Sequence, residues 1–313
     1  MLAVGYYISI LLGVAVKVHR QPPHPATKET APNPPDNIHI SVVLMNYARP
    51  GLLRRSTLLP TLIHHPSVAE IVLCHANPLT AFHYNHPKVH NTNATDWNNS
   101  MGLALRFYAC ATTAQHDWVL HLDDDMELDE SALDQLVATM VANPHRLVGH
   151  YARSYSYWRV PHRHGYEYAT TLFGNTMEVI LTKVVLMERA VCTSFVHRMS
   201  LMDDLVRTSV PLWNGEDIFA SLVANDMYGG SYNVAIEGLH VWEADNALKD
   251  DDAGAADISA NLDRHPFRLW TLADFATSRW RAWRHAYYRG RFWSIAKSRL
   301  AALREIEASS SAV

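Results

Sequence analysis

The chain has 313 residues, of which 48% are hydrophobic, and its formal net charge is −4 at pH 7. This length allows one large domain or two small ones with a substantial core, and the hydrophobic content excludes a chain that is disordered throughout. The small net charge favours neither nucleic acid nor a strongly charged partner. The 19 histidines are scattered without a zinc-binding spacing, and the three cysteines permit at most one disulfide, so they leave the compartment undecided.

The chain begins with an apolar segment. Residues 2–16 are uncharged and mostly apolar, and a helix extended to Val18 would measure about 26 Å, against about 30 Å for a bilayer core. We predict that residues 1–19 form a membrane anchor or a signal segment, and a cleaved signal peptide stays open as an alternative. Lys17 and Arg20 follow the segment, and the positive-inside rule would keep them in the cytoplasm, which argues against a type II anchor.

A proline-rich stretch follows. Residues 20–37 contain six prolines and no apolar periodicity, which predicts an extended stem. An apolar start, a stem and a globular domain are the layout of a membrane-tethered protein whose domain faces the lumen. The N-glycosylation sequons that start at Asn93 and Asn98 agree with that layout. We therefore expect residues 38–313 to form one domain on the lumenal side of the secretory pathway, in the Golgi.

From Ile38 onward the pattern alternates between strands and helices. The strands predicted in the first half cover residues 38–45, 70–74, 88–90 and 118–122. The predicted helices cover residues 52–65, with a proline break, and residues 100–114 and 131–143. The strands are short β-branched or apolar runs, and the last helix has a capping box at Ser131 and stops before Pro144. Strands that alternate with helices imply a mostly parallel sheet with helices on both faces.

The second half is less regular. We expect a strand at residues 146–151, a helix at residues 215–230 that closes at two glycines, and a strand at residues 232–238. Residues 243–259 are acidic and rich in small residues, which predicts a mobile loop. Two stretches rich in tryptophan and arginine then read as helices and run to about Glu307.

Three consecutive aspartates, Asp123 to Asp125, follow the strand predicted at residues 118–122. In α/β proteins, ligands lie beyond the carboxyl ends of the strands, and hard divalent cations bind one or two carboxylates together with substrate phosphates. The D-x-D spacing places Asp123 and Asp125 on the same side of an extended backbone. The triplet therefore predicts a site for Mn²⁺ or Mg²⁺. The alternative, a solvated acidic turn, suits Asp129 and Glu130 better, because the triplet adjoins a buried strand.

Six stretches of the chain resemble, in order and spacing, the C-terminal catalytic domain of the exostosin and exostosin-like glycosyltransferases. These stretches are VVLMNYARPGLL, VAEIVLCHANP, WVLHLDDDMEL, RLVGHYARS, TTLFGNTMEV and GEDIFASLVAN. The resemblance covers about Ile38 to Asp274. It implies one catalytic domain of the α/β GT-A fold, with a mostly parallel sheet flanked by helices and a C-terminal helical extension. It also implies a UDP-sugar donor, a manganese-type cation, and transfer of N-acetylhexosamine to a glycan or glycolipid with retention of configuration.

The resemblance implies a nucleotide-sugar site in the first half of the chain. Asn46, Tyr47 and Arg49 match the family's Asn-Tyr-x-Arg stretch, whose arginine faces the diphosphate. A guanidinium suits this task because its planar fork meets phosphate oxygens bidentately; the alternative for Arg49 is a solvated turn residue. Asp123 and Asp124 would contact the nucleotide sugar, while Asp125 and Asp123 would ligate the metal ion.

Three asparagines are weaker candidates for nucleotide binding. Asn77 is the one residue after the second strand that could serve uracil recognition, where the family usually has an asparagine pair. Asn98 and Asn99 match the family's Asn-Arg turn in part, because Ser100 replaces the arginine and Arg106 lies later.

The implied catalytic residues lie in the second half. Glu216 and Asp217 match an acidic pair that precedes a helix, although Glu216 also suits a helix N-terminus, where it would interact with the dipole. The late arginine that stabilises the departing diphosphate corresponds to Arg268, with Arg264 as the alternative.

Two rival interpretations remain open at this point. The first keeps the GT-A fold but makes the enzyme inverting, with Asp217 as the general base for the acceptor hydroxyl. The second is a carbohydrate-binding or scaffold protein with a degenerate site, which the missing asparagine and arginine favour and the intact acidic motifs oppose.

Overall fold

The computed structural model of the chain describes most of one compact unit, Pro32–Val313. The described residues are 38–47, 49–156, 165–168, 176–200, 215–230, 233–236, 239–243, 292–293, 295–307 and 309. The predicted N-terminal segment, the stem, most of the predicted acidic loop, and Arg264 and Arg268 lie outside these residues, so the domain boundaries stay predictions. Within the described residues, no helix combines the length and the apolar character needed to cross a bilayer.

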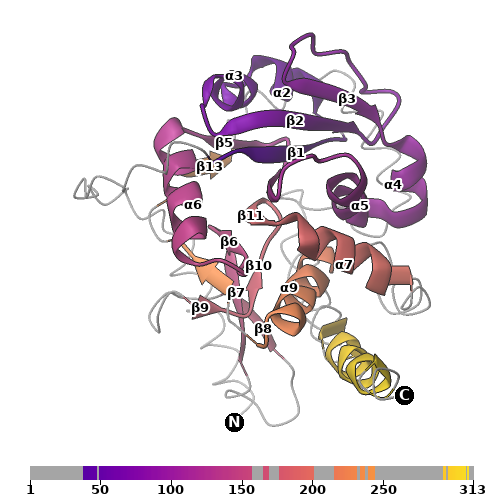
Figure 1. Cartoon of the computed structure of the whole chain (residues 1–313). Coiled ribbons are helices and arrows are strands. Elements are labelled where there is room, and N and C mark those ends of the chain that lie inside the picture. The colour runs from indigo at the N-terminus through magenta and orange to yellow at the C-terminus, as the bar shows by residue number, and fades with distance from the viewer. Residues whose placement is uncertain are drawn as a thin grey trace, which may run out of the picture. The chain divides into compact units, whose positions relative to one another are not determined.

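An eight-stranded sheet forms the centre of the unit (Figure 1). β1 (Ile40–Asn46) lies between β2 (Val68–His75) and β4 (Trp118–Leu122), and β3 (Val89–Asn93) forms the edge beyond β2. All these neighbours pair in parallel. Every residue of β1 is buried, as expected for a strand that helices cover on both faces.

The remaining strands continue the sheet beyond β4 and form two smaller sheets. In the large sheet, β11 (Val184–Glu188) pairs antiparallel with β4 and is followed by β6 (Val148–Gly149), β12 (Asn233–Ala235) and β9 (Thr176–Met177). The smaller sheets combine β10 (Val179–Ile180), β7 (Ala152–Ser156) and β8 (Gly165–Tyr168), and β5 (Met126–Leu128) with β13 (Val241–Glu243).

Helices cover both faces of the sheet, and alternate residues of β1 enter two separate cores. Ile40, Val42 and Leu44 pack in a core with residues of α2 (Pro50–Arg55), α3 (Leu58–His64) and α6 (Glu130–Ala142). Val43 and Met45 pack in the other core with residues of α5 (Leu105–Thr112), α7 (Arg189–Ser200), α9 (Glu216–Met227) and the helical residues 295–307. The two-residue period of a strand produces this division.

This arrangement confirms the predicted fold class, an α/β fold with a mostly parallel sheet, flanking helices and helical residues at the C-terminal end. Two predicted helices are divided, however. The helix predicted at residues 52–65 is interrupted at Ser56, where the backbone is extended between α2 and α3. The range predicted as one helix at residues 100–114 contains the end of α4 (Thr95–Met101), a 3₁₀ turn, η1 (Gly102–Ala104), and α5. The division arises because Gly102 adopts a positive φ of 53°, which stops α4.

A disulfide joins Cys110 on α5 to Cys192 on α7, and Cys74 is buried as a free thiol. The bond closes a loop with a sequence separation of 82 residues, for which chain entropy predicts on the order of 4 kcal/mol of stabilisation. It holds together two helices of the core that also contains α9.

We expect replacement of both Cys110 and Cys192 by alanine to lower the free energy of unfolding by about 2–4 kcal/mol. Denaturant unfolding with and without a dithiol reductant measures this effect. The reductant should destabilise the natural protein but leave the double variant unchanged. Cys74→Ala is the matched control, because it removes a buried sulfur that belongs to no disulfide. Equal sensitivity of the natural protein and the double variant to reductant would contradict the bond.

Candidate active site

The aspartate triplet lies at the carboxyl edge of the parallel strands. Leu44 of β1 pairs with Leu122, the last residue of β4, so the residues that follow both strands are neighbours. Met126 N donates to the Asp123 carbonyl at 3.3 Å, which makes the triplet a turn between β4 and β5. The triplet therefore occupies the edge where α/β proteins bind ligands.

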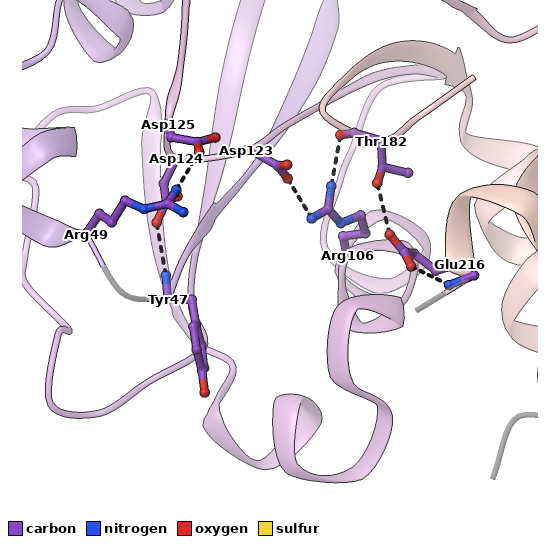
Figure 2. Close-up of polar contacts among 9 residues, drawn as sticks. Tyr47, Arg49, Arg106, Asp123, Asp124, Asp125, Thr182 and Glu216 are labelled. Carbon is purple, nitrogen blue, oxygen red and sulfur yellow. Dashed lines mark hydrogen bonds and ion pairs between the residues drawn. The ribbon is translucent and has the colours of Figure 1, made fainter. Parts of the chain in front are cut away.

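Arg49 lies against two of the three aspartates (Figure 2). Its Nη1 is 2.9 Å from Oδ1 of Asp124 and 2.7 Å from Oδ2 of Asp125. The backbone N–H of Tyr47 also donates to Oδ2 of Asp124 at 3.4 Å. The segment after β1 thus meets the triplet, although the two are more than seventy residues apart in sequence.

Burial makes the negative charges of the triplet costly. Burial raises the pKa of Asp124 to about 6; the positive charge of Arg49 opposes this rise, and the charges of Asp125 and Asp123 add to it. Because the folded pKa lies above its ordinary value, ionised Asp124 destabilises the fold at neutral pH; this cost declines as the pH falls below about 6 and is gone below the ordinary value of 3.8. A cation bound near Asp124 and Asp125 would relieve the same cost, because hard divalent ions prefer carboxylate oxygens as ligands.

The electrostatic balance also keeps Arg49 charged. Burial alone would lower the pKa of Arg49, but the three carboxylates of the triplet together raise it. The side chain is 36% exposed, so its guanidinium can still meet a ligand at the edge of the sheet. The alternative of a solvated turn residue therefore fits Arg49 poorly.

Asp123 points away from Arg49 and toward Arg106 (Figure 2). Nη2 of Arg106 is 2.8 Å from Oδ1 of Asp123, and Nη1 donates to the carbonyl of Thr182 at 2.9 Å. Burial alone would lower the pKa of Arg106, but Asp123 and Glu216 raise it. The expectation that Asp123 and Asp125 lie on the same side of an extended backbone is wrong, because the strand ends at Leu122 and the triplet forms a turn.

Thr182 connects this arginine to the acidic pair at the start of α9. Its hydroxyl donates to Oε1 of Glu216 at 3.1 Å, and Oε2 of Glu216 accepts the backbone N–H of Gly215 at 3.0 Å. Asp123, Arg106, Thr182 and Glu216 thus form one polar network that links the triplet to α9 (Figure 2). Glu216 is therefore both part of this network and a carboxylate at a helix N-terminus.

Asp217 follows Glu216 in the first turn of α9. It is 4% exposed, and its Oδ1 accepts the N–H of Ile218 at 2.8 Å. Gly215 precedes the pair with a φ of +147°, and a Cβ there would meet the ring of Phe292 at 3.2 Å. A glycine is therefore required where the chain enters the helix.

Among the described residues, no recorded hydrogen bond joins the predicted asparagines to the aspartate triplet. Asn46 is fully buried; its Nδ2 donates to the Thr80 carbonyl at 3.0 Å and lies 2.9 Å from Nδ1 of His75. Asn77 accepts the N–H of Leu79 at 3.0 Å. Asn98 and Asn99 lie on α4. Their roles in nucleotide binding stay predictions, and the geometry of Asn46 favours support of the loop after β2.

Arg106 and Thr182 are the site residues that sequence reasoning missed. Arg106 is buried on a helix whose other buried residues are apolar. A single arginine in such a stripe indicates a buried carboxylate partner, because an unpaired buried charge is costly. No pattern in the sequence indicates Thr182, because half of its role belongs to its backbone carbonyl, which every residue has.

We expect Thr182→Val to lower turnover about tenfold with little change in the KM for the donor. The valine keeps the shape of threonine but removes the donor to Glu216, and a lost hydrogen bond to a buried charged group costs about 1.5–3 kcal/mol. Steady-state kinetics measures the change, and Thr182→Ser should restore turnover because it keeps the hydroxyl. A serine variant as slow as the valine variant would show that packing, not the hydrogen bond, matters here.

The fold and this site are typical of an α/β enzyme that binds its ligand at the carboxyl edge of its sheet. Residues 40–266 match the Glycosyl transferase family 64 domain, so the chain belongs to that family and is a glycosyltransferase by class. Glycosyltransferase family protein 64 C3 of Arabidopsis thaliana is 29% identical over 126 residues. That match covers 40% of this chain and 37% of the relative.

A solved structure with a low likeness is "Crystal structure of GalNAc-T7 with UDP, GalNAc and Mn2+". It is 11% identical to this chain. The match covers 66% of this chain and 43% of the solved chain, with a TM-score of 0.36. This likeness carries no conclusion about the ligands of the present chain.

The resemblance to the exostosin and exostosin-like family is wrong as an assignment of family. The match over residues 40–266 places the chain in glycosyl transferase family 64, and the similar Arabidopsis protein carries the name of the same family. An acidic triplet after a strand and an acidic pair before a helix reflect the fold and the chemistry of the site, so they identify a class of enzyme better than a family.

Proposed function

We propose that the protein transfers a sugar from a UDP-sugar to a glycan or glycolipid acceptor, with Mn²⁺ or Mg²⁺ at the aspartate triplet. The observation that carries this proposal is the buried carboxylate cluster at the carboxyl edge of the sheet, with Arg49 against it. A cation held there by Asp125 and Asp123 would supply positive charge beside the diphosphate leaving group.

The residues of the site have distinct proposed roles. Asp125 and Asp123 hold the cation, and Arg49 turns from the carboxylates to the phosphate oxygens, which a guanidinium meets bidentately. Arg106 keeps Asp123 in place from its buried position. Arg268 is proposed to stabilise the departing diphosphate.

For the stereochemistry we propose retention, with Asp217 beside the anomeric carbon, where its negative charge stabilises oxocarbenium character. The support is the burial of Asp217 in the first turn of α9, whose dipole favours the ionised carboxylate. The donor sugar that we propose to test first is an N-acetylhexosamine. The inverting alternative gives Asp217 the role of general base.

A panel of UDP-sugars with Mn²⁺ tests the proposed activity by two measurements, donor hydrolysis and thermal shift. We expect one UDP-N-acetylhexosamine to raise the melting temperature and to be hydrolysed slowly, and EDTA to remove both effects. Binding of UDP without turnover of any donor or acceptor would favour the carbohydrate-binding or scaffold alternative. No thermal shift with any UDP-sugar would refute the proposal.

We also propose that the domain lies in the lumen of the secretory pathway, in the Golgi, and is tethered by residues 1–19. The disulfide between Cys110 and Cys192 supports an oxidising compartment, where such bonds persist. Protease treatment of intact vesicles tests the topology. Protection that is lost on adding detergent is expected, whereas digestion without detergent would favour the orientation that Lys17 and Arg20 suggest.

A further inference from the structure

We propose that Asn93 carries an N-linked glycan and that Asn98, in the neighbouring sequon, does not. This inference rests on the proposed lumenal location. Asn93 is the last residue of β3, the edge strand of the large sheet, and its side chain is exposed. Exposure at the end of an edge strand gives a glycan free space around the attachment point.

The local geometry of Asn93 suits glycan attachment. Its Oδ1 accepts the backbone N–H of Thr95 at 3.1 Å, an Asx turn that brings the threonine of the Asn-x-Thr sequon back toward the asparagine. Within the described part of the chain, Nδ2 of Asn93 donates no recorded hydrogen bond. Replacing one of its protons by a sugar therefore breaks no hydrogen bond recorded among the described residues.

The second sequon has a different environment. Asn98 lies within α4 and is only half-exposed. The hydroxyl of Ser100 donates to the carbonyls of Asp96 at 2.9 Å and Trp97 at 3.2 Å, so it is directed along the helix. A glycan on Asn98 would require this side chain to leave its half-buried position on α4.

The modification is a balanced group transfer. A new bond forms between Nδ2 of Asn93 and C1 of an oligosaccharide, the amide loses one proton, and the C1–O bond to a lipid diphosphate carrier breaks. The lipid-linked oligosaccharide of the secretory pathway is the co-reactant. The glycan then covers the end of a strand whose outer backbone groups pair with no other strand of the described sheet, and covering such an edge limits association between chains.

To test this proposal, the full chain is expressed with a C-terminal epitope tag in cultured eukaryotic cells. Extracts are treated with an N-glycosidase, and the shift in electrophoretic mobility is measured. We expect one deglycosylation shift in the natural protein and in Asn98→Gln, and none in Asn93→Gln. Thr95→Ser should keep the shift and Thr95→Ala should lose it, because the transfer needs the hydroxyl and not only the fold.

Protease protection of the same vesicles separates the two proposals. A protected chain without any shift, or one whose shift is lost in Asn98→Gln and kept in Asn93→Gln, would refute glycosylation at Asn93 and leave the lumenal location standing. A chain digested without detergent would refute the location, and the inference would fall with it.

Discussion

Asp125→Asn is expected to weaken Mn²⁺-dependent binding of UDP strongly while the fold remains intact. The side chain of Asp125 is 12% exposed, and its Oδ2 lies 2.7 Å from Nη1 of Arg49, at the edge where the triplet meets the loop after β1. Asparagine has the same shape but lacks the negative charge that a hard cation requires. We expect the affinity for UDP in Mn²⁺ to fall on the order of a hundredfold, in line with the loss of one electrostatic group from a preorganised site.

Calorimetric titration of UDP with and without Mn²⁺ measures this change, and thermal unfolding verifies the fold. Asp129→Asn is the matched control. Asp129 caps α6 by accepting the N–H of Ala132, a role that asparagine can also perform, and its ion pair with His240 is exposed. Activity that EDTA leaves undiminished, or full Mn²⁺-dependent binding in Asp125→Asn, would disprove the metal site.

Asp217→Ala is expected to lower turnover by a hundredfold or more and to change the affinity for the UDP-sugar much less. The carboxylate is buried at the N-terminus of α9, and its charge contributes to the raised pKa of Arg106, so it lies within the electrostatic reach of the network. A negative charge at this position acts on the sugar as positive charge develops, and not on the bound ground state. A loss confined to turnover is therefore expected.

Single-turnover kinetics and donor titration separate the two effects, and Asp217→Asn shows whether shape without charge is sufficient. An affinity loss as large as the turnover loss would assign Asp217 to binding. NMR of the product made from an α-linked UDP-sugar then decides the stereochemistry. A β-linked product would overturn retention and support the inverting alternative.

The central sheet and the place of the triplet were predictable from local patterns. β1 and β4 are short apolar runs, and the position of Asp123 to Asp125 directly after β4 follows from the chain order. Parallel strands end at a common edge, so the pairing of β1 with β4 brings Arg49 to the triplet. The exostosin assignment failed because motifs of this kind are shared between families.

The direction of each side chain was decided by tertiary structure. Asp123 and Asp125 face different arginines because the triplet turns after Leu122, and strand periodicity does not extend into a turn. Arg106 reaches Asp123 from the core face of α5, an arrangement that requires the packing of that helix on the sheet. Thr182 joins Arg106 to Glu216 across three separate segments of the chain.

The sequence by itself therefore determined that Asp123 to Asp125 lie at the carboxyl end of a strand, because they directly follow the apolar run of β4. Only the tertiary structure decided which carboxylate pairs with which arginine. The physical reason is that a buried charge needs a partner within a few ångströms, and such partners come from segments whose separation in sequence, 75 residues for Arg49 and Asp124, contains no information about distance in space.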